Sequence, residues 1–321
     1  MSDLTAQVSH MVDRLLSGEV AALARAISLV DSREEIGSQI HRAVRSSVGQ
    51  AEVIGITGPP GAGKSTLLNA LVSALRKNNK RVAVVAVDPS SPITGGAVLG
   101  DRTRMGEHTS DSGVFIRSLA ARGHLGGLSA SILKIIDLVD AAGWDVVLLE
   151  TVGAGQSETE VAEVADINVV VNAPGLGDDV QAIKAGILEI ADVLVVNKAD
   201  SPLAQRTERQ LKAMLQLRRE ESANVPVINT VATTGDGIDV LLSAITELTR
   251  TKFKSSKNKR LLDRVRRLVA QEAAAQAKQV ILGDQNPATL ALFEGILAGE
   301  YGYEEATVKL MSRRYAQAGC G

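Results

Sequence analysis

The segment GPPGAGKST, Gly58 to Thr66, follows the apolar run EVIGIT and precedes LLNALVSALRK, which has the periodicity of a helix. It matches the pattern G-x-x-x-x-G-K-[ST] in full, with a predicted strand before it and a predicted helix after it. Its glycines let the backbone curl, so that successive N–H groups and the helix N-terminus point toward phosphate oxygens. The segment therefore predicts a phosphate-binding loop in a P-loop NTPase fold.

Each position of this loop has an expected part in nucleotide binding. The ammonium group of Lys64 is expected between the β- and γ-phosphates, and the hydroxyl of Ser65 is an expected ligand of Mg²⁺. The predicted phosphate-binding residues are Gly58, Pro59, Pro60, Gly61, Ala62, Gly63, Lys64, Ser65 and Thr66. The loop by itself does not choose the base of the nucleotide.

The base is indicated by the four residues Asn197-Lys198-Ala199-Asp200, which follow the apolar run Val193 to Val196. In this N-K-x-D pattern the carboxylate can accept hydrogen bonds from the N1–H and the 2-amino group of guanine. Adenine has no such pair of donors on that edge, so guanine is preferred. Asn197, Lys198 and Asp200 are the expected base-binding residues, and together with the loop they predict GTP and GDP as ligands.

Hydrolysis of GTP requires a metal ion and an ordered water molecule. The run WDVVLLETVG, Trp144 to Gly153, places Glu150 at the tip of a predicted strand and Gly153 where its N–H can meet the γ-phosphate. Asp88, in VAVVAVDPSSP, and Asp101, in LGDRTRM, are carboxylates that can join the metal shell or orient water. The predicted catalytic residues are Lys64, Asp88, Asp101, Glu150 and Gly153, and the predicted metal ligands are Ser65, Asp88, Asp101 and Glu150.

Short runs rich in Val and Ile recur along the chain, without the polar alternation of a half-exposed sheet. Such runs are typical of parallel strands that are buried on both faces. They are Val53–Thr57, Val82–Val87, Val146–Leu149, Ile167–Val171 and Val193–Val196, and Val114–Leu119 and Pro226–Val231 are two further candidates. Stretches with helical periodicity lie between them. The pattern predicts an α/β protein with a mostly parallel sheet flanked by helices.

Helical patterns extend beyond this alternation at both ends of the chain. Residues 1–50 are predicted to form an N-terminal helical extension, residues 51–250 the P-loop GTPase domain and residues 251–321 a C-terminal helical arm. The apolar positions of the end helices exceed what one sheet can cover, which favours a subunit interface. We therefore expect a subunit interface in the C-terminal arm.

The composition restricts the class of partner and the compartment. Lys and Arg number 35 against 37 Asp and Glu, a net charge of -2, which gives no electrostatic case for binding nucleic acid or a membrane surface. The single cysteine, Cys320, permits no intrachain disulfide, which fits a reducing compartment. The N-terminal residues lack the continuous apolar block of a secretory signal. We expect a soluble, cytoplasmic protein.

Several further motifs accompany the phosphate-binding loop, and among them DPSSP together with ETVGAGQSE is far more specific than the loop alone. They are AVDPSSPITGGAVLGDRTRM, GHLGGLSA, ETVGAGQSETEVA, GDDVQAIKAGILEIADVLVVNKAD and GDGID, and with GPPGAGKST they span residues 53–240. The opening LLSGEVAALARAISLVDSR adds a characteristic N-terminal helix. Together these motifs resemble the MeaB/ArgK family, the GTPases associated with cobalamin-dependent acyl-CoA mutases, which includes the methylmalonic aciduria type A protein.

This resemblance implies a set of properties. Members bind Mg²⁺ and GTP, hydrolyse GTP slowly, form homodimers through C-terminal helices and act as chaperones of the mutase. They gate the transfer of adenosylcobalamin from its adenosyltransferase and protect or reactivate the mutase. Carried over to this chain, the resemblance implies that the backbone at Val231, Ala232 and Thr233 contacts the base. It also implies that Gly177 to Lys184 couples the nucleotide state to the partner.

The chain departs from the family pattern at a few positions, and one alternative function stays open. Members commonly read S-A where this chain has Val231-Ala232, and the sequence also differs at Ala154 and around Asn172. These departures concern partner choice more than nucleotide binding. The alternative is a P-loop kinase or ATPase that phosphorylates a small molecule or a protein. The N-K-A-D motif disfavours an ATPase, and no lid-like arginine cluster stands out beyond Arg102 and Arg104.

Overall fold

The structure is a computed structural model that describes residues 2–32, 34–89, 106–121, 128–151, 164–176, 185–216, 225–253 and 257–318. Several predicted functional positions fall at or beyond these bounds. Asp101, Gly153 and the segment Gly177–Lys184 lie outside the described residues, and for Asp88 only the backbone is described. The roles predicted for these residues therefore stay predictions.

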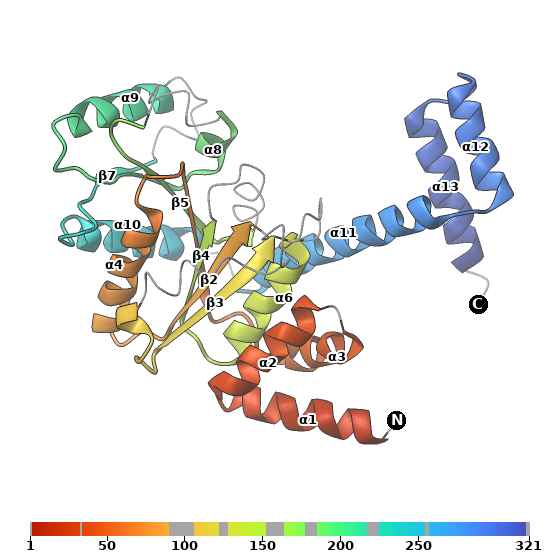
Figure 1. The fold of residues 1–321 in the computed structure, drawn as a ribbon, viewed down its shortest axis with the longest axis horizontal. Helices are drawn as coiled ribbons and strands as arrows, with labels where there is room; N and C mark the ends of the chain where they lie inside the picture. Colours follow the sequence, from red (N-terminus) through yellow and green to blue (C-terminus); the bar gives the residue numbers. More distant parts are fainter. Residues whose placement is uncertain are drawn as a thin grey trace. The chain divides into compact units, whose positions relative to one another are not determined.

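Within the described residues, seven strands form one parallel sheet, drawn as arrows in Figure 1. The strands are β1 (Glu52–Thr57), β2 (Val82–Pro89), β3 (Val114–Ala121), β4 (Val146–Thr151), β5 (Ile167–Asn172), β6 (Val193–Val196) and β7 (Val227–Asn229). Their order in the sheet is β3-β2-β4-β1-β5-β6-β7. The residues of β4, β5 and β6 are all buried, which explains why these strands lack polar alternation. The predicted α/β fold with a mostly parallel sheet is confirmed.

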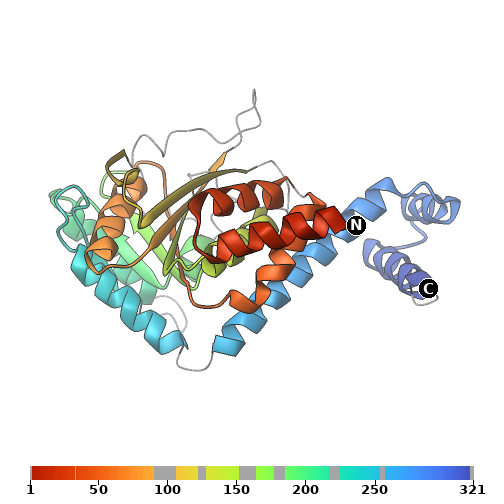
Figure 2. The ribbon, with the colours of Figure 1, turned by 90° about the horizontal axis from the view of Figure 1, so that it is seen from below.

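Helices cover both faces of this sheet. They are α1 (Ser2–Leu16), α2 (Val20–Asp31), α3 (Glu35–Val44), α4 (Lys64–Lys77), α6 (Leu128–Ala141), α8 (Ala185–Ile190), α9 (Ala204–Gln216) and α10 (Ile238–Phe253), with short 3-10 helices at η1 (Arg45–Ser47) and η2 (Gly106–His108). Alternate residues of β4 enter different clusters: Val146 and Leu148 pack with α4 and α10, whereas Val147 and Leu149 pack with α6 and the N-terminal helices. Figure 2 views the ribbon from the side on which α1 and α2 lie nearest to the reader.

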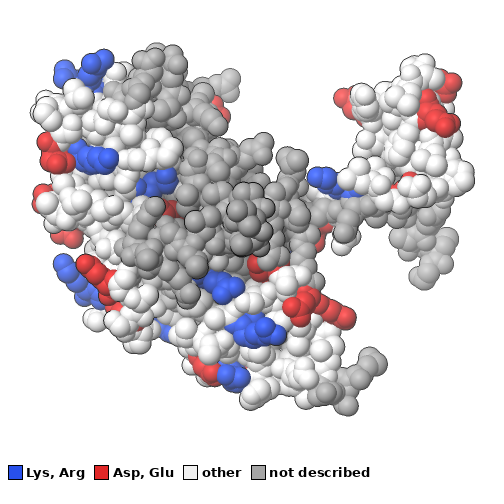
Figure 3. Space-filling view, in the orientation of Figure 1, with Lys and Arg blue, Asp and Glu red and all other residues white. Residues whose placement is uncertain are grey.

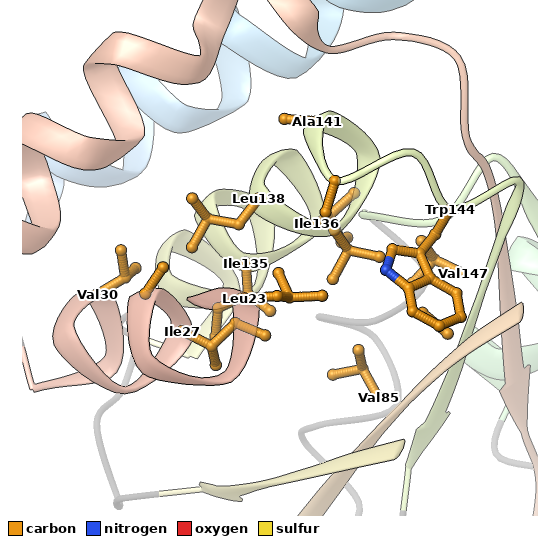
Figure 4. Packing of buried hydrophobic residues seen from close by; sticks show 14 of the residues in the cluster. Leu23, Ile27, Val30, Val85, Ile135, Ile136, Leu138, Ala141, Trp144 and Val147 are labelled. Atoms are coloured by element: carbon orange, nitrogen blue, oxygen red, sulfur yellow. The ribbon is translucent and has the colours of Figure 1, made fainter. Parts of the chain in front are cut away.

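The N-terminal helices share one aliphatic core with α6 and the sheet, shown in Figure 4. Leu23 and Ile27 of α2 belong to this core together with Ile135 of α6. Trp144, just before β4, belongs to the same core, and its ring is buried. The Arg81 guanidinium carbon lies 4.5 Å from the centroid of this ring. The lone tryptophan thus has a packing role, and helices α1 to α3 are part of the first compact unit described below.

A buried group of ionisable side chains joins α3, η1, α6 and the first half of α11 (Lys257–Gly283). The Asp137 carboxylate lies 2.9 Å from His41 Nε2 and accepts hydrogen bonds from Arg45 at 2.8 Å and from Arg264 at 3.1 Å. Burial on its own raises the pKa of Asp137, but the hydrogen bond with His41 and the charges of Arg264, His41 and Arg45 outweigh burial and hold that pKa below its ordinary value. Asp140, one turn along α6, accepts the N–H groups of residues 49 to 51.

The chain divides into two compact units, Met1–Gln271 and Glu272–Gly321. Helix α11 (Lys257–Gly283) begins in the first unit, where Arg264 and Leu268 are buried. The second unit contains α12 (Pro287–Leu297) and α13 (Tyr303–Ala318), which contact each other. Asn286 caps α12 by accepting a hydrogen bond from the backbone N–H of Ala288.

The surface carries charges of both signs. On the face drawn in Figure 3, the described Lys and Arg side chains lie interspersed with Asp and Glu side chains. Such a distribution matches the net charge of -2 of the whole chain. Among the described helices, none has the length and apolar character needed to cross a membrane.

Candidate nucleotide site

The phosphate-binding loop connects β1 to α4 at the carboxyl ends of the parallel strands, where ligands bind in open α/β sheets. At two positions of the loop, close contacts with neighbouring residues leave room only for glycine. Gly58 has a φ of 142°, and a Cβ there would lie 2.0 Å from the carbonyl oxygen of Val171 in β5. Gly63 has a φ of 86°, and its Cβ would lie 2.4 Å from the side-chain amide of Asn197. Only glycine fits at these positions, so the loop shape follows directly from the motif.

Lys64 is the first residue of α4, and its side chain folds back over the loop. Its ammonium group donates hydrogen bonds to the carbonyl oxygens of Gly58 at 2.8 Å and Pro59 at 3.1 Å. The side chain is buried, so its charge is held in the concave part of the loop. A cation held there is placed to meet phosphate oxygens, as the motif predicts.

Ser65 and Glu150 meet although they are distant in the chain. Ser65 lies in the first turn of α4, and Glu150 lies near the end of β4, in register with Ile56 of β1. The Ser65 hydroxyl donates a hydrogen bond of 2.7 Å to Glu150 Oε1, and the Glu150 side chain is buried. A hydroxyl oxygen beside a carboxylate oxygen is the donor set that Mg²⁺ prefers. These two predicted metal ligands are therefore brought together.

The other predicted acids are only partly placed by the structure. The backbone of Asp88 follows the β2 residue Val87, which is in register with Thr151 at the end of β4. This places the Asp88 backbone two strands from β1, at the same end of the sheet as Glu150. Asp101 and Gly153 lie outside the described residues. Among the described residues, no group of three or more His, Cys, Asp or Glu side chains could hold a metal ion.

Asn197 connects the base motif to the phosphate-binding loop. Its Nδ2 donates a hydrogen bond of 2.9 Å to the carbonyl oxygen of Ala62. Its Oδ1 accepts hydrogen bonds from the backbone N–H of Ala232 at 3.1 Å and from the Thr230 hydroxyl at 3.2 Å. The side chain is buried, so these three bonds satisfy it inside the protein. Asn197 thus holds the loop, the end of β6 and the segment after β7 in one arrangement.

Lys198 and Asp200 follow Asn197 on the surface of the site. Lys198 adopts a φ of 57°, and its ammonium group donates a hydrogen bond of 2.9 Å to the carbonyl oxygen of Gly61. The Asp200 side chain is exposed, and within the described residues its carboxylate accepts no hydrogen bond. The carboxylate is therefore accessible to a ligand that offers two N–H donors.

The residues predicted to contact the base through their backbone, Val231 to Thr233, lie in a tight turn after β7. Val231 pairs with Asp236 in an isolated antiparallel bridge, and the Thr234 hydroxyl donates a hydrogen bond of 2.8 Å to the Asp236 carboxylate. The N–H of Ala232 is engaged by Asn197, while Thr233 is exposed. Val231, Ala232 and Thr233 are thereby brought beside the N-K-A-D motif, since the N–H of Ala199 donates to the carbonyl oxygen of Thr230.

The structure also pairs two hydroxyls that the sequence analysis did not single out. Thr151 Oγ1 lies 3.2 Å from Thr57 Oγ1, and both side chains are buried. Each is the last residue of its strand, β4 or β1, and each directly adjoins a predicted nucleotide-binding motif. A hydroxyl residue at the end of a mostly apolar strand was the available sequence signal.

Comparison with known proteins gives consistent matches. Residues 23–285 match the family described as Methylmalonyl Co-A mutase-associated GTPase MeaB. A protein of Pyrococcus horikoshii that is named as a GTPase is 44% identical over 295 residues, which cover 91% of this chain and 92% of that protein. The Mus musculus protein named methylmalonic aciduria type A homolog, mitochondrial, is 37% identical over 267 residues, covering 76% of this chain and 64% of that protein.

A solved structure matches nearly the whole chain. The crystal structure of a LAO/AO transport system kinase is similar with a TM-score of 0.74 and 26% sequence identity, and the match covers 97% of this chain and 98% of that one. The residues matched by the family, 23–285, include the phosphate-binding loop, Glu150 and the N-K-A-D motif. The candidate site therefore lies inside the region that these proteins share.

Proposed function

The chain belongs to the MeaB family of GTPases, and from this premise we propose that it is the chaperone of a cobalamin-dependent acyl-CoA mutase, methylmalonyl-CoA mutase or a relative. In this proposal, GTP binding and hydrolysis gate the delivery of adenosylcobalamin from its adenosyltransferase and protect or reactivate the mutase. The family match carries the proposal, because the family description names this mutase and the match spans residues 23–285. The name of the mouse relative refers to methylmalonic aciduria, which supports the same partner.

The geometry of the site supports specific roles in binding GTP. The phosphates occupy the loop from Gly58 to Thr66, where Lys64 exchanges its bonds to loop carbonyls for bonds to phosphate oxygens, because anionic acceptors bind an ammonium group more strongly. The exposed Asp200 carboxylate accepts the N1–H and 2-amino hydrogens of guanine. Asn197 keeps its bonds inside the protein and holds the segment Val231–Thr233 beside the base.

Ser65 and Glu150 are the proposed ligands of Mg²⁺, because a hydroxyl oxygen paired with a carboxylate oxygen suits this ion. When bound, the metal neutralises charge on the phosphate oxygens. Asp88 and Asp101 are proposed to orient water or the outer shell of the metal, and the N–H of Gly153 is proposed to donate to the γ-phosphate. Loops whose contacts depend on the γ-phosphate rearrange on hydrolysis, and the segment Gly177–Lys184 is proposed to pass that change to the mutase.

We further propose a homodimer that forms through the C-terminal arm. In the second unit, large apolar side chains of α11, α12 and α13 are exposed: Leu282, Leu290, Leu297, Tyr303 and Val308. Helix α12, with the sequence PATLALFEGIL, is apolar on nearly every side. A pair of short helices cannot cover such a surface by itself, so a second copy of the chain is the proposed cover.

A reconstitution with purified components tests the chaperone function. The full chain is mixed with methylmalonyl-CoA mutase loaded with adenosylcobalamin, and both GTP hydrolysis and mutase activity are followed over repeated turnovers. We expect the mutase to accelerate GTP hydrolysis, and the chain with GTP to prolong mutase activity. If neither rate changes with methylmalonyl-CoA mutase or with the ethylmalonyl-, isobutyryl- and 2-hydroxyisobutyryl-CoA mutases, the chaperone proposal is wrong.

The same mixture distinguishes the GTPase proposal from the alternative that the chain is a kinase. The similarity to a protein named as a transport system kinase is the observation that keeps this alternative in view. With GTP labelled at the γ-phosphate, the GTPase proposal expects the label in inorganic phosphate only. Label transferred to the mutase or to another protein would instead indicate phosphorylation.

A further inference from the structure

The hydroxyls of Thr57 and Thr151 lie where the two strands that carry the nucleotide motifs come to an end. Thr57 directly precedes the phosphate-binding loop, and Thr151 directly follows Glu150. Thr151 Oγ1 donates a hydrogen bond of 3.2 Å to Thr57 Oγ1, and the two side chains are only 0% and 2% exposed. The bond thus joins the end of β1, which leads into the phosphate-binding loop, to the end of β4, which carries Glu150.

This bond lies beyond the backbone pairing of the two strands. The parallel register of β1 and β4 ends at the pair Ile56 and Glu150, and the threonines are the next residue on each strand. Because side chains alternate along a strand, Glu150 and Thr151 point to opposite faces of the sheet. Glu150 reaches Ser65 on the α4 face, so the hydroxyl pair ties the same strand ends on the other face.

Packing alone does not require hydroxyls at these positions. The in-register residue on β2 beside Thr151 is Val87, and the in-register residue on β5 beside Thr57 is Val170. Both valines are buried, and valine has nearly the shape of threonine. Within the described residues, the Thr151 hydroxyl is paired by its hydrogen bond to Thr57 Oγ1, and leaving a buried hydroxyl unpaired is destabilising. Their hydrogen bond therefore holds the strand ends together more specifically than apolar packing would.

We propose that Thr57 and Thr151 are positioning residues for GTP hydrolysis. Their hydrogen bond keeps Glu150 at a fixed place relative to the phosphate-binding loop. Small displacements of groups around a reacting phosphate lower the rate steeply, whereas contacts to the base and to the other phosphates are unaffected. This proposal rests on the GTPase activity of the family and not on the proposed mutase partner.

The test compares valine and serine variants of the full chain without any mutase. Thr57→Val and Thr151→Val remove the hydroxyl and keep the shape, while Thr57→Ser and Thr151→Ser keep the hydroxyl. We expect each valine variant to lower kcat for GTP hydrolysis about tenfold, the size expected for one lost positioning hydrogen bond. The serine variants should stay within about twofold of the parent kcat, and GDP affinity should change by less than about twofold in all four.

The double variant Thr57→Val/Thr151→Val tests whether the two hydroxyls act through their shared hydrogen bond. Residues that act through one shared bond are not additive, so kcat of the double variant should match the single valine variants within about twofold. Thr249→Val is the matched control, because Thr249 is a buried threonine of α10 whose hydroxyl has no partner among the described residues. This control should keep the parent values of kcat and GDP affinity.

Several results would overturn the proposal. Parent-like hydrolysis by either valine variant would show that the hydroxyl is not needed. Additive losses in the double variant would show that the two residues act separately. Equal losses of GDP affinity and kcat would indicate a general structural role, and a tenfold loss in the serine variants would assign the effect to volume instead of the hydroxyl.

Discussion

The Ser65 hydroxyl donates a hydrogen bond of 2.7 Å to Glu150 Oε1, and this contact joins the start of α4 to the end of β4. Most of the α4 contact with the sheet is aliphatic, so this polar contact stands apart at the loop end of the helix. It follows from the topology, because β4 lies directly beside β1, the strand that leads into the loop. The fold itself thus holds the two proposed metal ligands beside each other.

Replacing Glu150 by glutamine tests the importance of its charge. The amide oxygen can still accept the Ser65 hydrogen bond, but the negative charge that favours Mg²⁺ is lost. We expect magnesium affinity in the GDP complex, or kcat for GTP hydrolysis, to fall roughly 10- to 100-fold. Metal titration and phosphate release measure the two quantities. Glu247→Gln, at an exposed ion pair with Arg250, is the control and should leave both unchanged.

Replacing Asp200 by asparagine should change the choice of base. In the proposed site the exposed carboxylate accepts two donors from guanine, and an amide would replace one of those acceptors by a donor. We expect GTP affinity to fall about 100-fold and xanthosine triphosphate to bind better than GTP. Competition binding with both nucleotides measures this preference. An Asp200→Asn variant that still prefers GTP as strongly as the parent would refute the assignment, and the exposed Asp239→Asn is the control.

The buried Asp137 should make a large contribution to stability at neutral pH. Replacing it by asparagine removes the anionic partner that Arg45 has among the described residues and leaves Arg264 with Asp140 alone, 3.7 Å away. We expect the free energy of unfolding at pH 7 to fall by about 3–5 kcal/mol, as for other broken buried ion pairs. Asp263→Asn removes the exposed pair with Arg266, 3.3 Å apart, and should cost less than about 1 kcal/mol. Urea unfolding of the full chain measures both.

The pH dependence of this contribution follows from the lowered pKa of Asp137. A carboxyl whose pKa is lower in the folded state stabilises the fold above its ordinary pKa, which is about 4. That contribution is lost as the pH falls through the lowered value. The difference in unfolding free energy between the parent and Asp137→Asn should therefore be steady from about pH 7 to pH 5 and shrink below about pH 4. A difference that grows on acidification would contradict the assignment.

Charged substitutions in the C-terminal arm test the proposed homodimer. Leu297 and Val308 are 89% and 67% exposed, so aspartate at these positions is tolerated in the isolated chain but not in an apolar interface. We expect light scattering to give a dimer for the parent and a mass of 33.7 kDa for Leu297→Asp/Val308→Asp. Val240→Asp, at a residue of α10 that is 60% exposed, should remain dimeric. Dimers in all three proteins would place the interface elsewhere.

The site was predictable where a motif of adjacent residues carries its own geometry. The loop from Gly58 to Thr66 could be placed because its glycines adopt conformations and close contacts that other residues cannot. The two-sided burial of the strands was likewise visible in their Val- and Ile-rich runs. The bonds from Asn197 to Ala62 and Ala232 were not predictable, because they join three segments that are far apart in the chain.

The sequence by itself determined the parallel α/β fold, the phosphate-binding loop and the family, because each is written in local patterns of hydrophobicity or in contiguous motifs. Only the tertiary structure decided which distant side chains meet: Ser65 with Glu150, Thr57 with Thr151, and Asp137 with Arg264. The physical reason is that strand order, strand register and the packing of helices on the sheet set these distances. Neighbouring strands need not be neighbours in the chain, so no local pattern records the contacts between them.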